Sequence, residues 1–376
     1  MSATSSPSAR SAPASLAPPP EARSRRRRVA GWLFAVSFLV FAMIVLGGVT
    51  RLTHSGLSIT EWEPFIGTVP PLSDADWQVQ FEKYQLTPEF KLRNFDMTVE
   101  DFKPIFWMEY AHRLLGRVIG LAYFLPLVWF FVTRQVPRGT GGWLIALFVL
   151  GGLQGALGWY MVASGLVDDP RVSQYRLTAH LSLAFLIFAA AFWMALGLAR
   201  SPHRGAARPE AAAPRVLAYA VVGLVALMVV TGGFVAGIRA GLAYNTFPLM
   251  NGHLVPPEIF MLEPWWLNLF NNMATVQFNH RLFAWLLIFT VPVLWWLVRR
   301  RVSEPAARLA SSLLLAWLAV QVGLGIATVL LRLPLPIAAS HQGGAVVFLA
   351  LALWTAFELR RLGGAGGERV TSLPRA

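Results

Sequence analysis

Apolar residues fall into eight long runs that are separated by polar segments. A transmembrane helix needs about 20 mostly apolar residues to cross roughly 30 Å of hydrocarbon, and every run reaches that length. The pattern therefore predicts an all-α polytopic membrane protein with eight transmembrane helices. The runs cover residues 30–50, 105–132, 142–162, 177–199, 215–238, 273–298, 309–330 and 337–359.

The polar connections divide the chain into two halves of four helices each. We place the first bundle at 29–199 and the second at 215–361, joined by a linker at 200–214. Two connections are long, 51–104 and 239–271, and each holds tryptophan and proline among charged residues, which is typical of a small folded cap. We expect the Arg- and Pro-rich residues 1–28 to be a disordered basic tail, and 362–376 to be a second tail.

Basic residues are concentrated in alternate connections, which indicates how the helices are oriented. With the amino terminus inside, the cytoplasmic segments hold 20 Lys and Arg residues and the external ones 9, while Asp and Glu number 5 and 13. This bias predicts that both termini are cytoplasmic. The net charge of +13 is then a signal of topology, and we expect no nucleic-acid partner.

Composition narrows the chemistry that the chain can carry. It is 56% hydrophobic and 14% charged, where a soluble domain has about 25% charged residues. It contains no cysteine, which excludes disulfides, thiolate metal sites and iron–sulfur clusters. The candidate metal or cofactor ligands that remain are seven histidines: His54, His112, His180, His203, His253, His280 and His341.

An internal repeat relates the two halves. Four anchors recur in the same order: Gly47-Gly48 with Gly232-Gly233 at an offset of 185, His112-Arg113-Leu114 with His280-Arg281-Leu282, Gln154 with Gln321, and His180 with His341. Because each half has an even number of helices, both halves share one orientation. The repeat therefore predicts two tandem four-helix bundles related by a pseudo-twofold axis along the membrane normal.

Four of the histidines occupy repeat-equivalent positions near the external ends of their helices. His112 and His180 belong to the first half, and His280 and His341 belong to the second. Two imidazoles at matched depth suit the two axial positions of a haem iron. Zinc or copper is the competing interpretation, although such sites usually gather three or four ligands, and each histidine could also be an ordinary interfacial residue.

A cluster of charged residues surrounds His112. Glu109 precedes it by three residues on the same helix face, and a charge at mid-membrane costs roughly 2.5–3.5 kcal/mol. The matching residue of the second half is Gln277, so only the first half has an acid, which could donate or accept a proton. The alternative is that Glu109 only pairs with Arg113 or Arg117.

Arg113 and Arg281 directly follow the first histidine of each half. A guanidinium at this level would suit a haem propionate, because it forms charge-assisted hydrogen bonds with carboxylates. Snorkelling of the side chain to lipid headgroups explains the same positions equally well.

With these residues identified, the sequence resembles the haem A synthase family over residues 30–360. The stretches that carry the resemblance are Gly47-Gly48-Val49-Thr50-Arg51-Leu52-Thr53, Ser55-Gly56-Leu57-Ser58, Trp62, Pro64, Gly67, Pro70-Pro71, Glu109-Tyr110-Ala111-His112-Arg113, Ala240 to Pro248 and Asn279-His280-Arg281. The resemblance implies an oxidoreductase that converts the C8 methyl group of haem O to a formyl group, giving haem A for cytochrome c oxidase. It also implies a haem b cofactor on His280 and His341, substrate haem on His112 and His180, and Glu109 as the essential acid.

The resemblance has further implications for partners and for rival functions. Some family members carry a cysteine pair in the first external loop, so this chain resembles the cysteine-free branch of alphaproteobacteria and mitochondria. Haem O synthase, an unidentified electron acceptor or donor and a second copy of the chain are the expected partners. The rivals are a di-haem b-type electron carrier, which leaves the one-sided glutamate unexplained, and a transporter with parallel repeats, which would place polar residues at the midplane.

Overall fold

The computed structural model describes residues 20–61, 66–167, 169–200 and 208–363, and these residues are overwhelmingly helical. Each of the eight predicted apolar runs forms a helix that is long and apolar enough to cross a membrane, which confirms the predicted fold class. The long helices are α1 (Pro20–Leu52), α4 (Val99–Val132), α5 (Gly141–Ala163), α6 (Gln174–Ala199), α7 (Ala212–Gly237), α9 (Met273–Arg301), α10 (Pro305–Leu330) and α11 (Leu335–Arg361).

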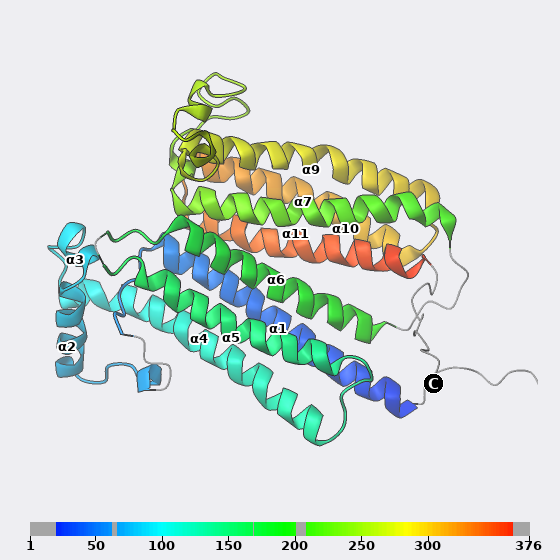
Figure 1. Ribbon diagram of the computed structural model, residues 1–376, viewed down its shortest axis with the longest axis horizontal. Helices are drawn as coiled ribbons and strands as arrows, with labels where there is room; N and C mark the ends of the chain where they lie inside the picture. The colour runs from blue at the N-terminus through cyan, green and yellow to red at the C-terminus, as the bar shows by residue number, and fades with distance from the viewer. Residues whose placement is uncertain (1–19, 62–65, 168, 201–207, 364–376) are drawn as a thin grey trace, which may run out of the picture.

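The helices form two groups that follow the order of the chain (Figure 1). In the first group, α4 and α6 each pack on α1 and α5, and in the second, α9 and α11 each pack on α7 and α10. The groups meet where α1 and α6 pack against α7 and α11, and most of the buried apolar side chains lie in and around these four helices. Two four-helix groups are therefore present, and the exact pseudo-twofold axis between them stays a prediction.

The long connection 51–104, here called the cap, contains two helices, α2 (Asp74–Gln85) and α3 (Pro88–Leu92). The Ser73 side chain caps α2, and the Thr87 side chain caps α3, in each case by accepting a backbone N–H. The underside of the cap packs on the first turns of α4 through one aromatic cluster. Its buried members are Trp77, Phe81, Tyr84, Phe102 and Phe106.

The remaining short elements lie in the connections. They are the 3₁₀ turns Ile66–Thr68, Pro209–Ala211, Ala240–Leu242, Pro257–Phe260 and Trp265–Leu267, and the single-turn helix α8 (Asn268–Asn271). Most of them belong to the second long loop, 239–271, which the structure shows as a folded segment. Both long connections thus contain short helical elements.

Two predicted boundaries were wrong. Helix α1 begins at Pro20, so residues 20–28 are helical and are not part of a disordered tail. Proline is tolerated in the first turn and arginine is a good helix former, which explains why the helix extends through the arginine run. Helix α4 begins at Val99, ahead of the apolar run, because Thr98 and Asp101 form a capping box there. Residues 1–19 and 364–376 lie outside the described residues.

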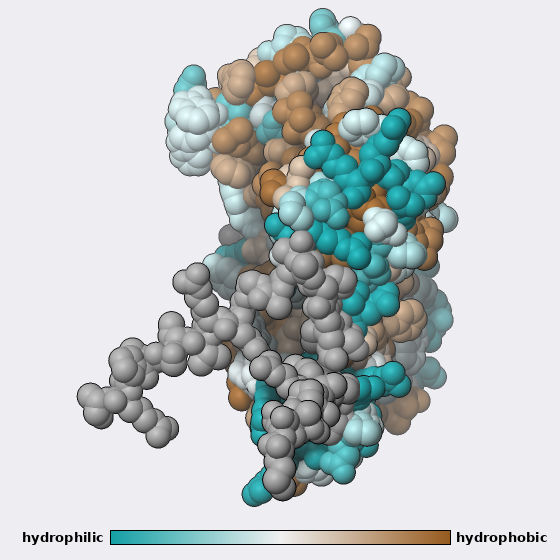
Figure 2. Space-filling view, turned by 90° about the vertical axis from the view of Figure 1, so that its right-hand side faces the viewer, coloured by the Kyte–Doolittle hydropathy of each residue, from teal (hydrophilic) through white to brown (hydrophobic). Residues whose placement is uncertain are grey.

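Both described ends of the chain lie at one end of the bundle, opposite the cap (Figure 1). That end carries Arg299–Arg301 and Arg360–Arg361, and hydrophilic side chains gather over it (Figure 2). Glu358 of α11 is fully buried there, where it binds Arg361 at 2.6 Å and Arg200, at the end of α6, at 3.2 Å. This cluster joins the two halves at the arginine-rich end.

Candidate functional site

Each of the four repeat-equivalent histidines lies against a glycine of a neighbouring helix. A Cβ atom placed on Gly47 would lie 3.1 Å from the His112 ring, and one on Gly158 would lie 2.9 Å from the His180 ring. The second half repeats the arrangement, with distances of 3.2 Å from Gly232 to His280 and 3.0 Å from Gly325 to His341. A larger residue at any of these glycines would displace the imidazole beside it.

The histidines of each half lie on helices that are diagonally opposite in the bundle. His112 is on α4 and His180 is on α6, and these helices both pack on α1 and α5. The two rings are close enough for their charges to interact, and the same holds for His280 of α9 and His341 of α11. Each half therefore places two imidazoles near one another, on two helices that both pack on the same pair of neighbours.

Hydrogen bonds from a glutamine hold two of the four histidines. The Gln154 amide donates to the His180 carbonyl at 3.0 Å, and Gln321 donates to the His341 carbonyl at 2.9 Å. Both amides also lie against a ring nitrogen of the same histidine, at 3.3 and 3.2 Å. The repeat-matched glutamines are thus partners of the repeat-matched histidines.

Glu109 is the buried acid of the first half, with only 3% of its surface exposed. Its Oε1 atom accepts from Arg113 Nε at 2.9 Å and Nη2 at 2.6 Å. Its Oε2 atom accepts from the Ser58 hydroxyl at 2.8 Å and from the Ile59 N–H at 2.9 Å. The carboxylate therefore binds Arg113 and the cap loop at the same time, one helical turn from His112.

Gln277 occupies the same place in the second half, but it donates hydrogen bonds to its loop, whereas Glu109 accepts them. Its Nε2 donates to the carbonyls of Ala240 at 3.0 Å and Tyr244 at 3.3 Å, and its Oε1 accepts from Arg281 at 3.3 Å. The first-half loop presents an N–H and a hydroxyl, which a carboxylate can accept. The second-half loop presents carbonyls, which need the N–H donors of an amide.

Arg113 and Arg281 both bind backbone carbonyls of the long loops. Arg113 donates to Ile59 at 2.7 Å and Glu61 at 2.8 Å, and Arg281 donates to Tyr244 at 3.1 Å. These arginines therefore anchor the long loops next to the histidines. Their contact with a haem propionate stays a prediction.

The remaining histidines lie elsewhere. His54 Nδ1 is 3.3 Å from Arg239 in the connection between cap and bundle, and His253 closes a turn with Met250. Burial lowers the pKa of His54, and the nearby Arg239, Arg93 and Arg51 lower it further. His203 lies outside the described residues.

The residues present fit a planar iron-bearing group better than a compact metal site. Within the described residues, no group of three or more His, Asp or Glu side chains could hold a metal ion together. Two neighbouring imidazoles per half are the ligand set of a six-coordinate haem, and the buried Nδ1 atom of His180 has no hydrogen-bond partner. The glycine beside each ring leaves room for that imidazole.

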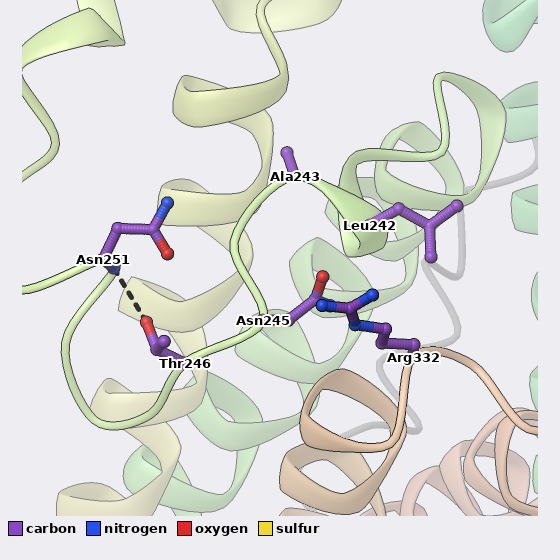
Figure 3. A pocket seen from close by; sticks show the side chains of 6 residues that line it. All are labelled: Leu242, Ala243, Asn245, Thr246, Asn251 and Arg332. Carbon is purple, nitrogen blue, oxygen red and sulfur yellow. Dashed lines mark hydrogen bonds between the residues drawn. The ribbon is translucent and has the colours of Figure 1, made fainter.

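The open pocket in Figure 3 is a separate feature of the second long loop. Asn245 and Arg332 point toward each other there, and the Asn251 N–H donates to the Thr246 hydroxyl at 2.7 Å. None of the four repeat-equivalent histidines lines it, so the pocket is not the site described above.

Comparison with known proteins identifies the family. Residues 30–353 match the family model described as cytochrome oxidase assembly protein. The chain belongs to this family. Among its relatives is a heme A synthase of Nitrosospira multiformis, 58% identical over 338 residues, which covers 89% of this chain and 94% of the relative. Others named heme A synthase come from Nitrosomonas eutropha, 53% identical over 88% of this chain and 93% of the relative, and Parvibaculum lavamentivorans, 48% identical over 89% and 94%.

Membership of the cytochrome oxidase assembly family agrees with the resemblance found in the motifs. The contacts of the site add residues whose roles the motifs did not reveal. In the sequence, Gly47 and Gly232 are noticeable only as anchors of the repeat. Thr231 contacts His280, but the first half has no matching threonine, so the repeat does not point to it. The placement in a cysteine-free branch stays a prediction.

Proposed function

We propose that this protein is a haem A synthase that oxidises the C8 methyl group of haem O to a formyl group. The observation that carries the proposal is the pair of neighbouring buried imidazoles in each half, together with a carboxylate beside them in the first half only. The names of relatives that are 46–58% identical over most of the chain support the same reaction. A di-haem electron carrier would also need four histidines, but it would not need Glu109.

In this proposal the first half binds the substrate and the second half binds a haem cofactor, haem b. His112 and His180 hold haem O by its iron, and His280 and His341 hold haem b. When bound, haem b supplies one-electron transfer between the substrate site and an electron acceptor. The apolar helices around both pairs exclude water and orient the macrocycle, while the loops bound by Arg113 and Arg281 lie over the sites.

Glu109 is proposed as the proton-handling group of the substrate site. If water supplies the oxygen atom of the formyl group, oxidation of the methyl group releases protons and passes its electrons to the electron acceptor, and a carboxylate near the reacting group can accept the protons. Its contact with the Ser58 hydroxyl, at 2.8 Å, provides a route from the carboxylate toward the cap. Arg113 holds the acid in place through two hydrogen bonds.

The location and partners follow from the chemistry. Eight apolar helices make this a multi-pass membrane protein. We place it in the bacterial inner membrane with both termini in the cytoplasm and the haem sites toward the periplasmic side. Haem O has a large apolar macrocycle, so a haem O synthase in the same membrane is the proposed donor. An electron acceptor and a second copy of the chain complete the proposed partners.

The test is production of haem A. The protein is co-expressed with a haem O synthase in a bacterial host that lacks haem A, and the haems are extracted and separated by chromatography. We expect a purified protein with a low-spin b-type spectrum and extractable haem A. A red protein that yields no haem A would favour the di-haem electron carrier, and a colourless protein would contradict both functions.

A further inference from the structure

The imidazoles of His280 and His112 occupy corresponding positions of the repeat but are held differently. His280 Nδ1 lies 2.9 Å from the Thr231 hydroxyl, one residue before the glycine that supports the ring. The matching residue in the first half is Leu46, whose side chain has no hydrogen-bonding atom. Among the described residues, the His112 ring makes no hydrogen bond.

The surroundings of Thr231 allow its hydroxyl to accept a hydrogen bond from His280. Its Oγ1 atom also lies 3.1 Å from the Leu227 carbonyl and 3.2 Å from the Met228 carbonyl, one turn back in α7. A hydroxyl has a single hydrogen, and a carbonyl can only accept it. If Nδ1 of His280 carries the ring hydrogen, it donates to Oγ1, and the hydroxyl hydrogen can go to one of the two carbonyls. This tautomer leaves the Nε2 lone pair of His280 free to bind iron.

We propose that Thr231 is the positioning residue that retains the haem of the second half, and that Leu46 leaves the first half able to release its haem. The inference rests on the proposed function, which assigns a cofactor to one half and a substrate to the other. A cofactor has to stay bound through many turnovers, whereas a product has to leave. The two halves share the ligating histidines, the glycines beside them and the glutamines. The difference between Thr231 and Leu46 therefore changes the support of His280 relative to that of His112.

Physical precedent sets the expected size of the effect. Partners that fix the tautomer and orientation of a ligating histidine typically change metal affinity by 10–100-fold when they are removed. The same hydrogen bond makes the ligating nitrogen more basic, which favours the ferric state. Loss of the Thr231 hydroxyl should therefore speed haem release and raise the reduction potential of the second-half haem.

The experiment measures haem release from each half separately. The double variant His112→Ala/His180→Ala confines haem to the second half, and Thr231→Val and Thr231→Ser are made in this background. Thr290→Val is the matched control, because the Thr290 hydroxyl bonds back to its own helix, the helix of His280, without touching an imidazole. The rate of haem transfer to excess apomyoglobin and the reduction potential are both recorded.

The first half receives the reciprocal change. Leu46→Thr is made in a His280→Ala/His341→Ala background, where only the first half can bind haem. The inserted hydroxyl occupies the position that Thr231 has in the second half. Haem release from the first half should therefore become slower, by about the same factor by which Thr231→Val speeds release from the second half.

Each outcome decides a different point. We expect about 10-fold or faster release and a raised potential for Thr231→Val, with Thr231→Ser and Thr290→Val close to the parent. Equal release rates for Thr231→Val and its parent, in proteins with the same thermal stability, would overturn the inference while the proposed function stands. A His112→Ala/His180→Ala protein that binds no haem would contradict the proposed cofactor site itself.

Discussion

The carboxylate of Glu109 and the guanidinium of Arg113 form a buried ion pair with two hydrogen bonds, of 2.9 and 2.6 Å. The pair is one turn apart on α4, and it also holds the cap loop, since Glu109 accepts the Ile59 N–H and Arg113 donates to the Ile59 carbonyl. Glu109 is therefore both the acid nearest to His112 in sequence and an anchor for the loop above it. Substitutions can separate these two roles.

Replacing Glu109 by glutamine should abolish most of the activity while keeping the haem. The amide preserves shape but cannot accept a proton from the substrate site, and removal of a general acid or base costs about 10²–10⁴-fold in rate. We expect haem A production to fall at least about 100-fold with unchanged haem content. Chromatography of extracted haem, beside an absorption spectrum of the purified variant, measures both quantities. Production near that of the wild type would remove Glu109 from catalysis.

Replacing Arg113 by alanine should destabilise the first half more than the matching change at Arg281 destabilises the second. Arg113→Ala leaves a buried carboxylate without its partner, which costs about 3–5 kcal/mol. Arg281→Ala removes hydrogen bonds from a guanidinium to neutral oxygens, and it leaves no buried charge without a partner, so it should cost less. Thermal unfolding of the two variants in detergent tests the difference, and equal losses of stability would show that the Glu109–Arg113 pair is not a true buried ion pair.

Adding a methyl group beneath His180 should expel haem from the first half. In Gly158→Ala the new Cβ would lie 2.9 Å from the His180 ring, so the ring has to move out of its position. Gly155→Ala is the control, because nothing lies within 4 Å of a Cβ at that position of the same helix. We expect about half of the haem to be lost in the first variant and none in the second, as measured by the pyridine haemochrome assay.

Much of this architecture follows from the sequence because a bilayer leaves few alternatives. Apolar runs of 20 residues or more must be helical to satisfy their backbone, so all eight helices could be predicted. The helix ends could not, since α1 extends to Pro20 through arginines that carry no apolar signal. The repeat identified the histidines and the Glu109–Gln277 difference. It could not show that the first-half loop offers hydrogen-bond donors to Glu109 and the second-half loop offers acceptors to Gln277, because those contacts depend on tertiary structure.

Glu89 gives the cap a dependence on pH that the sequence does not reveal. Its side chain is 2% exposed, and its Oε2 atom has no hydrogen-bond partner among the described residues. Burial raises the pKa of Glu89 from 4.5 to about 7, Glu109 adds to the rise, and Arg93 and Arg239 oppose it. The folded protein therefore holds a proton on Glu89 at pH values where the unfolded chain has lost it.

The sign of the effect on stability follows from this difference. Between pH 4.5 and about 7 the folded state binds more protons than the unfolded state, so the free energy of unfolding falls as the pH rises through this window, by about 3 kcal/mol in total. In Glu89→Gln this contribution disappears, and the variant should gain stability relative to the wild type as the pH increases from 5 to 8. Thermal unfolding across that range tests the prediction, with the exposed Glu82→Gln as a control that keeps the wild-type profile. Parallel profiles for Glu89→Gln and the wild type would show that Glu89 is ionised throughout, with its charge neutralised by Arg93 and Arg239.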